Sequence, residues 1–324
     1  MLFTAYHGTI GGMETLRVVF CFDENLVAQV QAAAASLLDA RGSDDHFEIH
    51  CVCTKAAGIV QAPLEQVIRR RDPASTLVMH CVENPYEDAY QVRDISAGTY
   101  LRLALPGLLP EVDRILYMDA DVLVRESLAP LLKTPMEGMT LAAVKGAVNL
   151  SDKWEWNSDR SYWHLLSEMK GGYINAGVTL LHLAEVRKRG LAGRWHELTG
   201  ERFYYQDQDI LNMTCRGTIA YLPPKYNRLA YLEDQDFEQF VTEGIYTREE
   251  VREALRSPAI IHYAGDKPWK RYDTNLGSLW WDYVSAQPDL RDLFDEEKAR
   301  RYHGPTLAQR AARKVKKLLS REKL

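Results

Sequence analysis

Residues 114–124 read RILYMDADVLV, and this stretch holds two acids, Asp119 and Asp121, between two apolar runs. The run before the acids predicts a buried strand that ends in carboxylates at residue 121. On an extended strand, side chains two residues apart point to the same side. Both carboxylates can therefore reach one hard cation such as Mg²⁺ or Mn²⁺, which would offset their mutual repulsion. The alternative is a solvated or capping pair of acids.

The segments that precede this stretch alternate between strand and helix patterns. Short apolar runs predict strands at residues 16–22, 47–53 and 76–82. Helical patterns predict helices at 26–38, 62–71 and 95–105, the last stopping at Pro106. Such alternation is typical of an α/β fold with a mostly parallel central sheet and helices on both faces. Ligands in these folds bind at the carboxyl ends of the strands, where the two acids lie.

Beyond the acids the pattern is less regular. We predict strands at residues 141–148 and 173–183, a helix at 184–198 and another helix that starts near Asp207. The sequence shows no internal repeat and no Gly/Ser linker. We therefore divide the chain into an N-terminal extension (1–13), one large domain (14–285) and a basic C-terminal extension (286–324).

The composition excludes several classes of protein. The 324 residues are 46% hydrophobic and 26% charged, unlike a disordered or collagen-like chain. No apolar stretch is long enough to span a bilayer. The net charge of −5 is uneven, because residues 298–324 hold ten Lys or Arg and a single acid. The rest of the chain is acidic, which argues against nucleic acid as a partner.

The cysteines and the first residues bear on localisation. None of the five cysteines forms a C-x-x-C pair, so we expect reduced core residues and a cytoplasmic protein. Residues 1–13 have no basic segment and no long apolar core, so we predict no signal peptide. Met13 is an alternative start.

Two further segments carry candidate binding residues. His262 ends an apolar run and is a candidate third metal ligand, with a core histidine as the alternative. Gly265 would let the backbone approach a phosphate, and Lys267 would neutralise one, unless both belong to a surface turn. Asn175 and Ala176, followed by a glycine, combine an amide with small residues that leave room for a ligand; a β-bulge or turn is the alternative.

Two polar groups lie on predicted helices. Asp207 and Gln208 would either present a carboxylate and an amide to hydroxyl groups or act as helix caps. Arg102 lies among apolar residues and needs an anionic partner, which is either a ligand or an internal ion pair.

Several widespread catalytic signatures are absent from the sequence. There is no P-loop, no G-x-G-x-x-G after the first strand, no G-x-S-x-G and no H-E-x-x-H. The first predicted strand ends instead in FDEN (residues 22–25). Asp23 and Asn25 there are either helix caps or groups that read a base.

Five motifs occur together and in order: FCFDEN, TYLRLALPGLLPEVDRILYMDADVLV, YINAGVTLLHL, YYQDQDILN and HYAGDKPW. With these motifs, from about residue 16 to 269, the sequence resembles the family 8 retaining glycosyltransferases. That family includes bacterial lipopolysaccharide galactosyl- and glucosyltransferases and the glycogenins. The resemblance implies a GT-A fold and transfer of a hexose from a UDP-sugar, UDP-glucose or UDP-galactose, with Mn²⁺ or Mg²⁺. The acceptor would be a hydroxyl of a glycan or lipid-linked saccharide, in lipopolysaccharide or other cell-surface glycan synthesis.

The resemblance also implies roles for single residues. The metal ligands would be Asp119, Asp121 and His262. The donor would be contacted by Cys21, Asp23, Asn25, Arg102, Ala120, Asn175, Ala176, Gly265 and Lys267. The catalytic pair would be Asp207 and Gln208. Because the amide of Gln208 is a poor nucleophile, we favour attack on the sugar from the face that UDP leaves.

Some features depart from the family or fit other functions. An acid that relatives often carry after the strand at 141–148 has no counterpart here, and the aromatic loop at 154–163 either stacks on sugars or packs internally. A nucleotidyltransferase would carry a Gly-rich basic loop after the first strand. A non-catalytic carbohydrate-binding protein and a self-glucosylating enzyme are further alternatives.

The C-terminal residues 305–324 place apolar side chains along one helical stripe among basic residues. This pattern predicts an amphipathic helix that binds an anionic membrane surface, on the inner face of the cytoplasmic membrane. A solvated helix or a disordered tail is the alternative.

Overall fold

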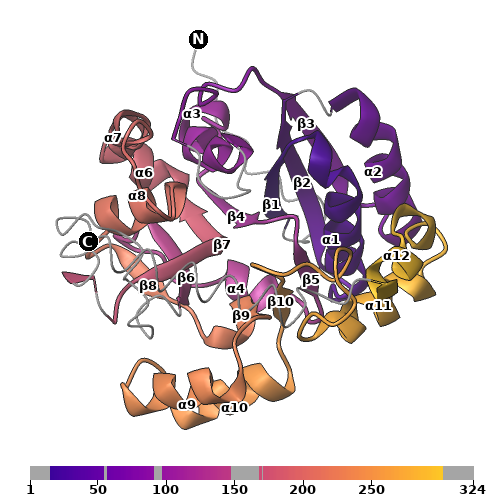
Figure 1. The fold of residues 1–324 in the computed structure, drawn as a ribbon. Helices are drawn as coiled ribbons and strands as arrows, with labels where there is room; N and C mark the ends of the chain where they lie inside the picture. The colour runs from indigo at the N-terminus through magenta and orange to yellow at the C-terminus, as the bar shows by residue number, and fades with distance from the viewer. Residues whose placement is uncertain (1–14, 55–56, 91–96, 147–167, 170, 302–324) are drawn as a thin grey trace, which may run out of the picture. The chain divides into compact units, whose positions relative to one another are not determined.

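The computed structural model describes residues 15–54, 57–90, 97–146, 168–169 and 171–301 (Figure 1). The chain divides into two compact units, Met1–His262 and Tyr263–Leu324, which are described separately. The predicted division at residues 285 and 286 stays a prediction. The predicted N-terminal extension, the aromatic loop at 154–163 and the amphipathic tail lie outside the described residues. Among the described helices, none is both long and apolar enough to cross a membrane.

The first unit is built around a seven-stranded sheet with the order β3-β2-β1-β4-β7-β6-β8. Its strands are β1 (Thr15–Phe22), β2 (His46–Cys53), β3 (Thr76–Cys81), β4 (Arg114–Met118), β6 (Leu141–Lys145), β7 (Ile174–His182) and β8 (Ile219–Tyr221). In this sheet β7 pairs antiparallel with β4 and β6, and the other pairs are parallel. The predicted mostly parallel sheet is confirmed. The start of β7 therefore lies at the same edge as the ends of β1 and β4.

Two groups of helices pack on this sheet (Figure 1). The first group is α1 (Val27–Asp39) and α2 (Ala57–Arg71), which contact each other and the strands β1 and β3. The second group is the 3-10 segment η2 (Ala97–Ala104) with helices α3 (Leu105–Leu108), α6 (Leu183–Lys188), α7 (Leu191–Leu198) and α8 (Asp207–Thr214). Val19, Ile115 and Trp195 share one buried cluster with this second group. Because side chains alternate along a strand, Val18 and Phe20 face the other group.

A smaller sheet has the order β5-β10-β9. Its strands are β5 (Val122–Val124), β9 (Arg228–Leu229) and β10 (Ile260–His262), with β10 antiparallel to β5 and parallel to β9. Among the described residues, the first unit also contains η1 (Glu24–Leu26), α4 (Ala129–Leu132), η5 (Pro224–Asn227), α9 (Asp234–Thr242) and α10 (Arg248–Arg256). In chain order α9 and α10 separate β9 from β10.

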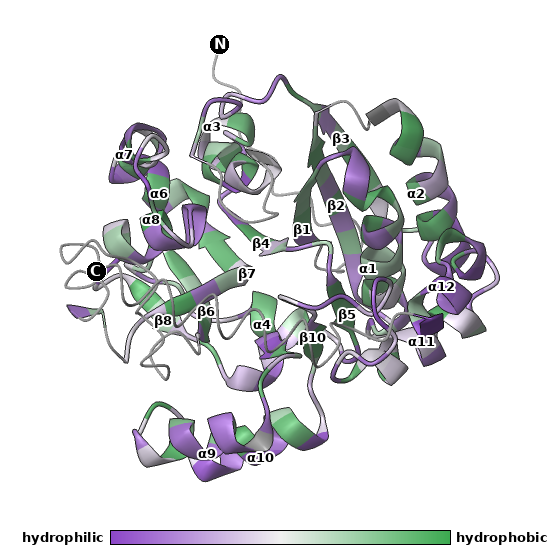
Figure 2. Cartoon of the chain, in the orientation of Figure 1, coloured by the Kyte–Doolittle hydropathy of each residue, from purple (hydrophilic) through white to green (hydrophobic). Residues whose placement is uncertain are grey.

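The second unit contains α11 (Gly277–Ala286), η6 (Arg291–Leu293) and α12 (Glu296–Arg301). Its core is aromatic: the ring of Trp280 lies 5.6 Å from that of Tyr263, 4.9 Å from Trp269 and 5.5 Å from Phe294. Helix α12 is mostly hydrophilic, in contrast to the hydrophobic residues of β1 and β4 (Figure 2).

Three predicted elements differ from the structure. The strand predicted to reach residue 121 ends at Met118, and the acids lie in the turn between β4 and β5. The predicted helix at 95–105 is wrong in its type and its end: η2 is a 3-10 helix, and Pro106 lies in the first turn of α3, where its missing N–H has no partner to lose. The predicted helix at 184–198 is two helices, separated at Gly190, whose φ of 68° favours glycine.

Candidate metal and sugar-nucleotide site

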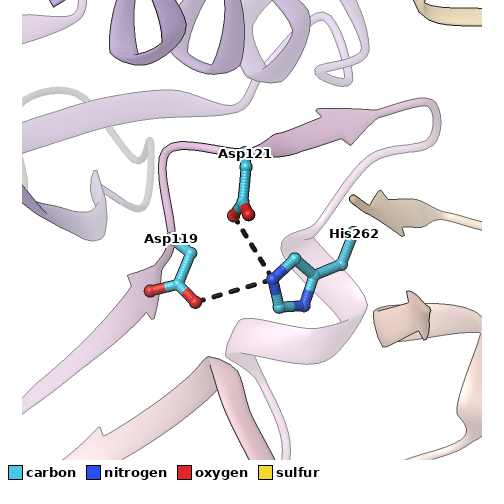
Figure 3. A group of neighbouring side chains, drawn as sticks. All are labelled: Asp119, Asp121 and His262. Carbon is cyan, nitrogen blue, oxygen red and sulfur yellow. Dashed lines mark ion pairs between the residues drawn. The ribbon is translucent and has the colours of Figure 1, made fainter. Parts of the chain in front are cut away.

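Asp119, Asp121 and His262 lie together in the first unit (Figure 3). Nε2 of His262 is 3.5 Å from Oδ2 of Asp119 and 3.3 Å from Oδ1 of Asp121. The three side chains are 28%, 12% and 3% exposed, in that order. The structure thus brings the three predicted metal ligands into one partly shielded cluster.

The pairing of two short strands explains this meeting. Val122, the first residue of β5, is opposite His262 on β10. Asp121 directly precedes Val122, so the pairing places its carboxylate beside the imidazole. Asp119 is held separately, because its backbone N–H donates to the carbonyl of Gly177 on β7 at 2.8 Å. The turn between β4 and β5, rather than an extended strand, therefore brings the two acids together.

Gly177 allows this close approach. A Cβ at this position would lie 2.1 Å from Cε1 of His262 and 2.7 Å from Oδ2 of Asp119, both shorter than real contacts. The sequence predicted that the small residues here leave room for a ligand. At Gly177 the room is instead filled by two of the candidate metal ligands.

The donor set fits a divalent cation. Nδ1 of His262 lies 2.9 Å from Oδ1 of Asn227, and an amide oxygen can only accept, so Nδ1 carries the hydrogen. In the neutral ring Nε2 presents its lone pair to two carboxylates, and a cation among these three groups would offset their mutual repulsion. Carboxylate oxygens suit Mg²⁺ and Mn²⁺, and an imidazole nitrogen suits transition metals. The residues present therefore fit an ion such as Mn²⁺.

Arg102 is buried and joins two acids of the site. Its Nη2 lies 2.8 Å from Oδ1 of Asp119, and its Nε lies 2.8 Å from Oδ2 of Asp207. Nη1 donates to the carbonyl of Ala176 at 2.7 Å, and the guanidinium lies 4.0 Å from the centre of the Tyr117 ring. The internal ion pair is thus present, and it orients Asp119. The predicted contact of Arg102 with the donor stays a prediction.

Burial changes the ionisation of the groups around Arg102. It raises the pKa of Asp207 to about 6, although the Arg102 cation opposes this change. Thr99 also stabilises the ionised form of Asp207, by donating from Oγ1 to Oδ1 at 3.1 Å. Burial raises the pKa of the Cys21 thiol well above its usual range, so Cys21 stays neutral. Asp207 therefore titrates in the range where enzymes work, and Cys21 does not.

Gln208, Asn175 and Ala176 are also brought together. Oε1 of Gln208 accepts from the backbone N–H of Ala176 at 3.0 Å and from Nδ2 of Asn175 at 3.2 Å. Helix α8 follows Gln206, whose φ of 50° lies in the left-handed region and is strained for a residue other than glycine. Strain of this kind is concentrated at functional sites.

The other predicted donor contacts lie on two units. Cys21 is buried near the end of β1, and Ala120 is buried in the turn between the two acids. Asp23 caps η1 by accepting from the backbone N–H of exposed Asn25 at 2.9 Å. These contacts with a donor stay predictions.

Gly265 and Lys267 lie in the second unit. Gly265 has a φ of 87°, which favours glycine and forms the turn that the sequence suggested. Nζ of Lys267 donates to the carbonyl of Tyr263 at 2.8 Å. Their contacts with a diphosphate also stay predictions.

Sequence reasoning missed several residues of this site. Asn227 contacts His262, and Tyr117 donates to Oδ1 of Asp119 at 2.5 Å. Asp209 accepts both from the backbone N–H of Tyr205 and from the hydroxyl of Tyr173. Tyr117 stands two residues before Asp119, which is a usable signal because side chains two apart on the predicted strand point to the same side. Asn227 follows a Pro-Pro turn, and nothing in its neighbourhood signals the contact.

Comparisons with known proteins show the family of this chain. The model of glycosyl transferase family 8 matches residues 17–273. General stress protein A of Bacillus subtilis (strain 168) is 22% identical over 271 residues, which cover 79% of this chain and 88% of the relative. A lipopolysaccharide 1,2-glucosyltransferase of Escherichia coli (strain K12) is 29% identical over 190 residues, which cover 55% of this chain and 50% of the relative.

Solved structures show the same architecture. Galactosyltransferase LgtC, in complex with donor and acceptor sugar analogs, aligns with a TM-score of 0.67 and 26% identity, covering 84% of this chain and 96% of that protein. The apo structure of the bifunctional glycosyltransferase WbbM aligns with a TM-score of 0.73 and 20% identity, covering 91% of this chain and 53% of that protein. The predicted GT-A fold is confirmed.

Proposed function

Because the chain belongs to glycosyl transferase family 8, we propose that it transfers a glucose or galactose from a UDP-sugar to a hydroxyl of a glycan. The single observation that carries this proposal is the cluster of Asp119, Asp121 and His262 at the edge of the sheet where such folds bind ligands. Relatives named as a lipopolysaccharide glucosyltransferase and a galactosyltransferase favour a glycan of the cell surface as the product.

The metal ligands proposed are Asp119, Asp121 and His262, with Mn²⁺ as the preferred ion. These residues would hold an ion whose positive charge would offset the negative charge of the diphosphate leaving group. Arg102 keeps the carboxylate of Asp119 in position through the ion pair of 2.8 Å. In the second unit, Lys267 and the backbone at Gly265 are proposed to contact the diphosphate, where a lysine charge also favours departure.

The donor sugar is proposed to lie against the group formed by Asn175, Ala176, Asp207 and Gln208. The buried carboxylate of Asp207 and the amide of Gln208 can bond sugar hydroxyls and so orient the anomeric carbon. Cys21, Asp23, Asn25 and Ala120 are proposed to line the nucleotide side.

The reaction is proposed to retain the anomeric configuration. The acceptor oxygen forms a bond to the anomeric carbon on the face from which the phosphate oxygen leaves. The acceptor proton passes to the departing phosphate oxygen. Gln208 is the nearest candidate nucleophile, but its amide oxygen is held by two hydrogen bonds and is a weak nucleophile. Asp207 and Gln208 therefore position the sugar.

UDP release from a panel of nucleotide sugars, with and without Mn²⁺, tests this function. We expect metal-dependent turnover of one UDP-hexose, lost in Asp121→Ala and kept in Asp292→Ala, whose side chain is 89% exposed. Turnover that is equal in Asp121→Ala and wild type would contradict the metal role. The absence of both turnover and metal-dependent UDP binding would favour a non-catalytic carbohydrate-binding protein.

We also propose that the basic tail binds anionic membranes, where a lipid-linked acceptor would lie. The support is the apolar stripe among basic residues in the sequence 305–324. Deletion of residues 305–324 should abolish sedimentation with anionic vesicles and leave UDP release unchanged. Equal sedimentation of the deletion variant and the full chain would contradict this proposal.

A further inference from the structure

Two backbone amides fix the orientation of two side-chain amides next to the metal ligands. The N–H of Ala176 donates to Gln208, so the atom of Gln208 that faces it is the oxygen, Oε1. The N–H of Gly177 donates to Asn175 at 3.1 Å, so the atom of Asn175 that faces it is Oδ1. Backbone N–H groups cannot accept hydrogen bonds, and neither amide can therefore be flipped without losing one.

These orientations determine the direction of the remaining bonds. With Oδ1 of Asn175 fixed as an acceptor, Asn227 must present its Nδ2 to it, at 2.8 Å. Oδ1 of Asn227 then faces Nδ1 of His262 at 2.9 Å and requires a hydrogen on that nitrogen. The hydrogen on the imidazole is thus specified by the backbone of β7.

The series of hydrogen bonds continues from Asn175 to Gln208, away from His262. Nδ2 of Asn175 donates to Oε1 of Gln208 at 3.2 Å, and Nε2 of Gln208 donates to the hydroxyl of Tyr173 at 3.1 Å. Tyr173 in turn donates to the buried carboxylate of Asp209 at 2.5 Å. A carboxylate can only accept hydrogen bonds, so the series of bonds ends at Asp209. Each donor in the series therefore lies on the His262 side of its acceptor, as the two backbone amides require.

We propose that Asn227 and Asn175 form a one-directional hydrogen-bond relay that holds the hydrogen of the neutral His262 ring on Nδ1. The relay thereby leaves Nε2 for metal binding and links this candidate ligand to the amide of Gln208. This proposal rests on the metal role given above and goes beyond it. Asn227 acts on the metal through His262 and does not contact it, so Asn227 is a positioning residue. Asn175 extends the relay to Gln208. Partners of this kind on a metal-bound histidine commonly change metal affinity by about 10- to 100-fold.

Two substitutions at Asn227 separate the two ends of the relay. Asn227→Leu removes both bonds at nearly constant volume. Asn227→Asp keeps an acceptor for Nδ1 of His262 but places a second carboxylate oxygen against Oδ1 of Asn175. Oδ1 of Asn175 is already an acceptor, so the two oxygens repel each other. This repulsion should displace Asn175 and Gln208 and leave the orientation of His262 unchanged.

Mn²⁺ binding, measured by electron paramagnetic resonance, and UDP release with saturating Mn²⁺ are the two readouts. Asn227→Leu should weaken Mn²⁺ binding by about 10- to 100-fold. Asn227→Asp should bind Mn²⁺ as tightly as the wild type or more tightly, and its kcat should fall. Wild-type Mn²⁺ affinity in Asn227→Leu, or an equal loss of affinity in both variants, would overturn the proposal.

Asn212→Leu is the matched control. Asn212 is buried and holds β7 through the N–H and carbonyl of Ile174, at 2.7 and 3.1 Å. It also donates to the backbone carbonyl of Gln208 at 2.8 Å, but it bonds none of the relay's side chains. This variant should lose stability and keep Mn²⁺ affinity. A loss of affinity as large as that of Asn227→Leu would assign the effect to general destabilisation and overturn the proposal.

The ¹⁵N signals of His262 separate failure of the relay from failure of the proposed function. If the wild type binds no Mn²⁺, the metal-dependent function fails. In the metal-free protein at alkaline pH, a hydrogen on Nδ1 still supports the relay, and a hydrogen on Nε2 overturns it, because ring nitrogens with and without hydrogen have separate chemical shifts.

Discussion

Gly177 packs directly against two of the candidate metal ligands. An added methyl group would have to displace the ring of His262 or the carboxylate of Asp119. We expect Gly177→Ala to weaken Mn²⁺ binding by more than about tenfold, since precise ligand placement sets metal affinity. Mn²⁺ titration followed by electron paramagnetic resonance measures this change.

Gly193 offers the control for that substitution. It lies in α7, and a Cβ there would meet nothing within 4 Å. Gly193→Ala should keep Mn²⁺ affinity and gain up to about 1 kcal/mol of stability, because alanine favours the helix. Equal Mn²⁺ affinity in both glycine variants would contradict the steric argument.

Asp207 should make stability depend on pH. Its pKa is about 6 in the folded protein, above the value of 3.8 for a free side chain, so the folded state holds the proton more tightly. This contribution is fully present below pH 3.8 and is lost as pH rises through 6. Relative to Asp207→Asn, the free energy of unfolding of the wild type should fall by about 3 kcal/mol between pH 3.5 and 7. Urea unfolding at several pH values measures it, and a difference that is constant with pH would contradict the prediction.

At the scale of an element, α10 carries a clear stability signal. Oγ1 of Thr247 accepts from the backbone N–H of Glu250 at 3.2 Å, and Oε2 of Glu250 accepts from the backbone N–H of Thr247 at 2.8 Å. Thr247→Ala removes the first bond and should lower the free energy of unfolding by about 1 kcal/mol, with Mn²⁺ affinity unchanged.

Thr242→Ala is the comparison for α10. Thr242 lies in the last turn of α9 and donates only to the carbonyl of Glu238, as an exposed side chain. Its substitution should change the unfolding free energy, measured with urea, by less than that of Thr247. A larger loss at Thr242 would show that the capping box of α10 contributes little.

The elements show what sequence patterns can and cannot predict. The strands at the centre of the sheet were predicted because apolar runs bounded by polar residues carry the signal locally. The two acids were predicted on a strand because their neighbours on both sides are apolar, yet a turn intervenes. That turn depends on β5 pairing with β10, a partner distant in the chain.

At the scale of the molecule, ligand binding should stabilise the first unit. A ligand that binds only the folded state at 100 times its Kd adds about 2.7 kcal/mol. Mn²⁺ with UDP should therefore raise the Tm of the wild type, as measured by calorimetry. Asp121→Ala should show no Mn²⁺-dependent increase, and an equal increase in both proteins would place the metal elsewhere.

Site residues were predicted best where the chemistry of a single side chain indicates its role. The meeting of Asp119, Asp121 and His262 was predicted because carboxylates and imidazole are metal-binding groups, and their role as metal ligands stays a prediction. The role of Asn227, at the end of η5, was not predictable, because its amide acquires a role only beside His262 on β10 and Asn175 on β7. Arg102 illustrates the intermediate case: its need for an anion was evident, but the choice of Asp119 and Asp207 required the fold.

The pairing of β5 with β10 has a consequence for how the protein folds. Asp121 precedes β5 and His262 ends β10, so the chain must close a long loop before these two residues meet. Contacts between distant residues form slowly, because the entropy of loop closure is lost first. Metal affinity should thus appear late in refolding, after the strands β1 to β4 have paired. A nascent chain that has not yet exposed residue 262 would lack the full set of ligands.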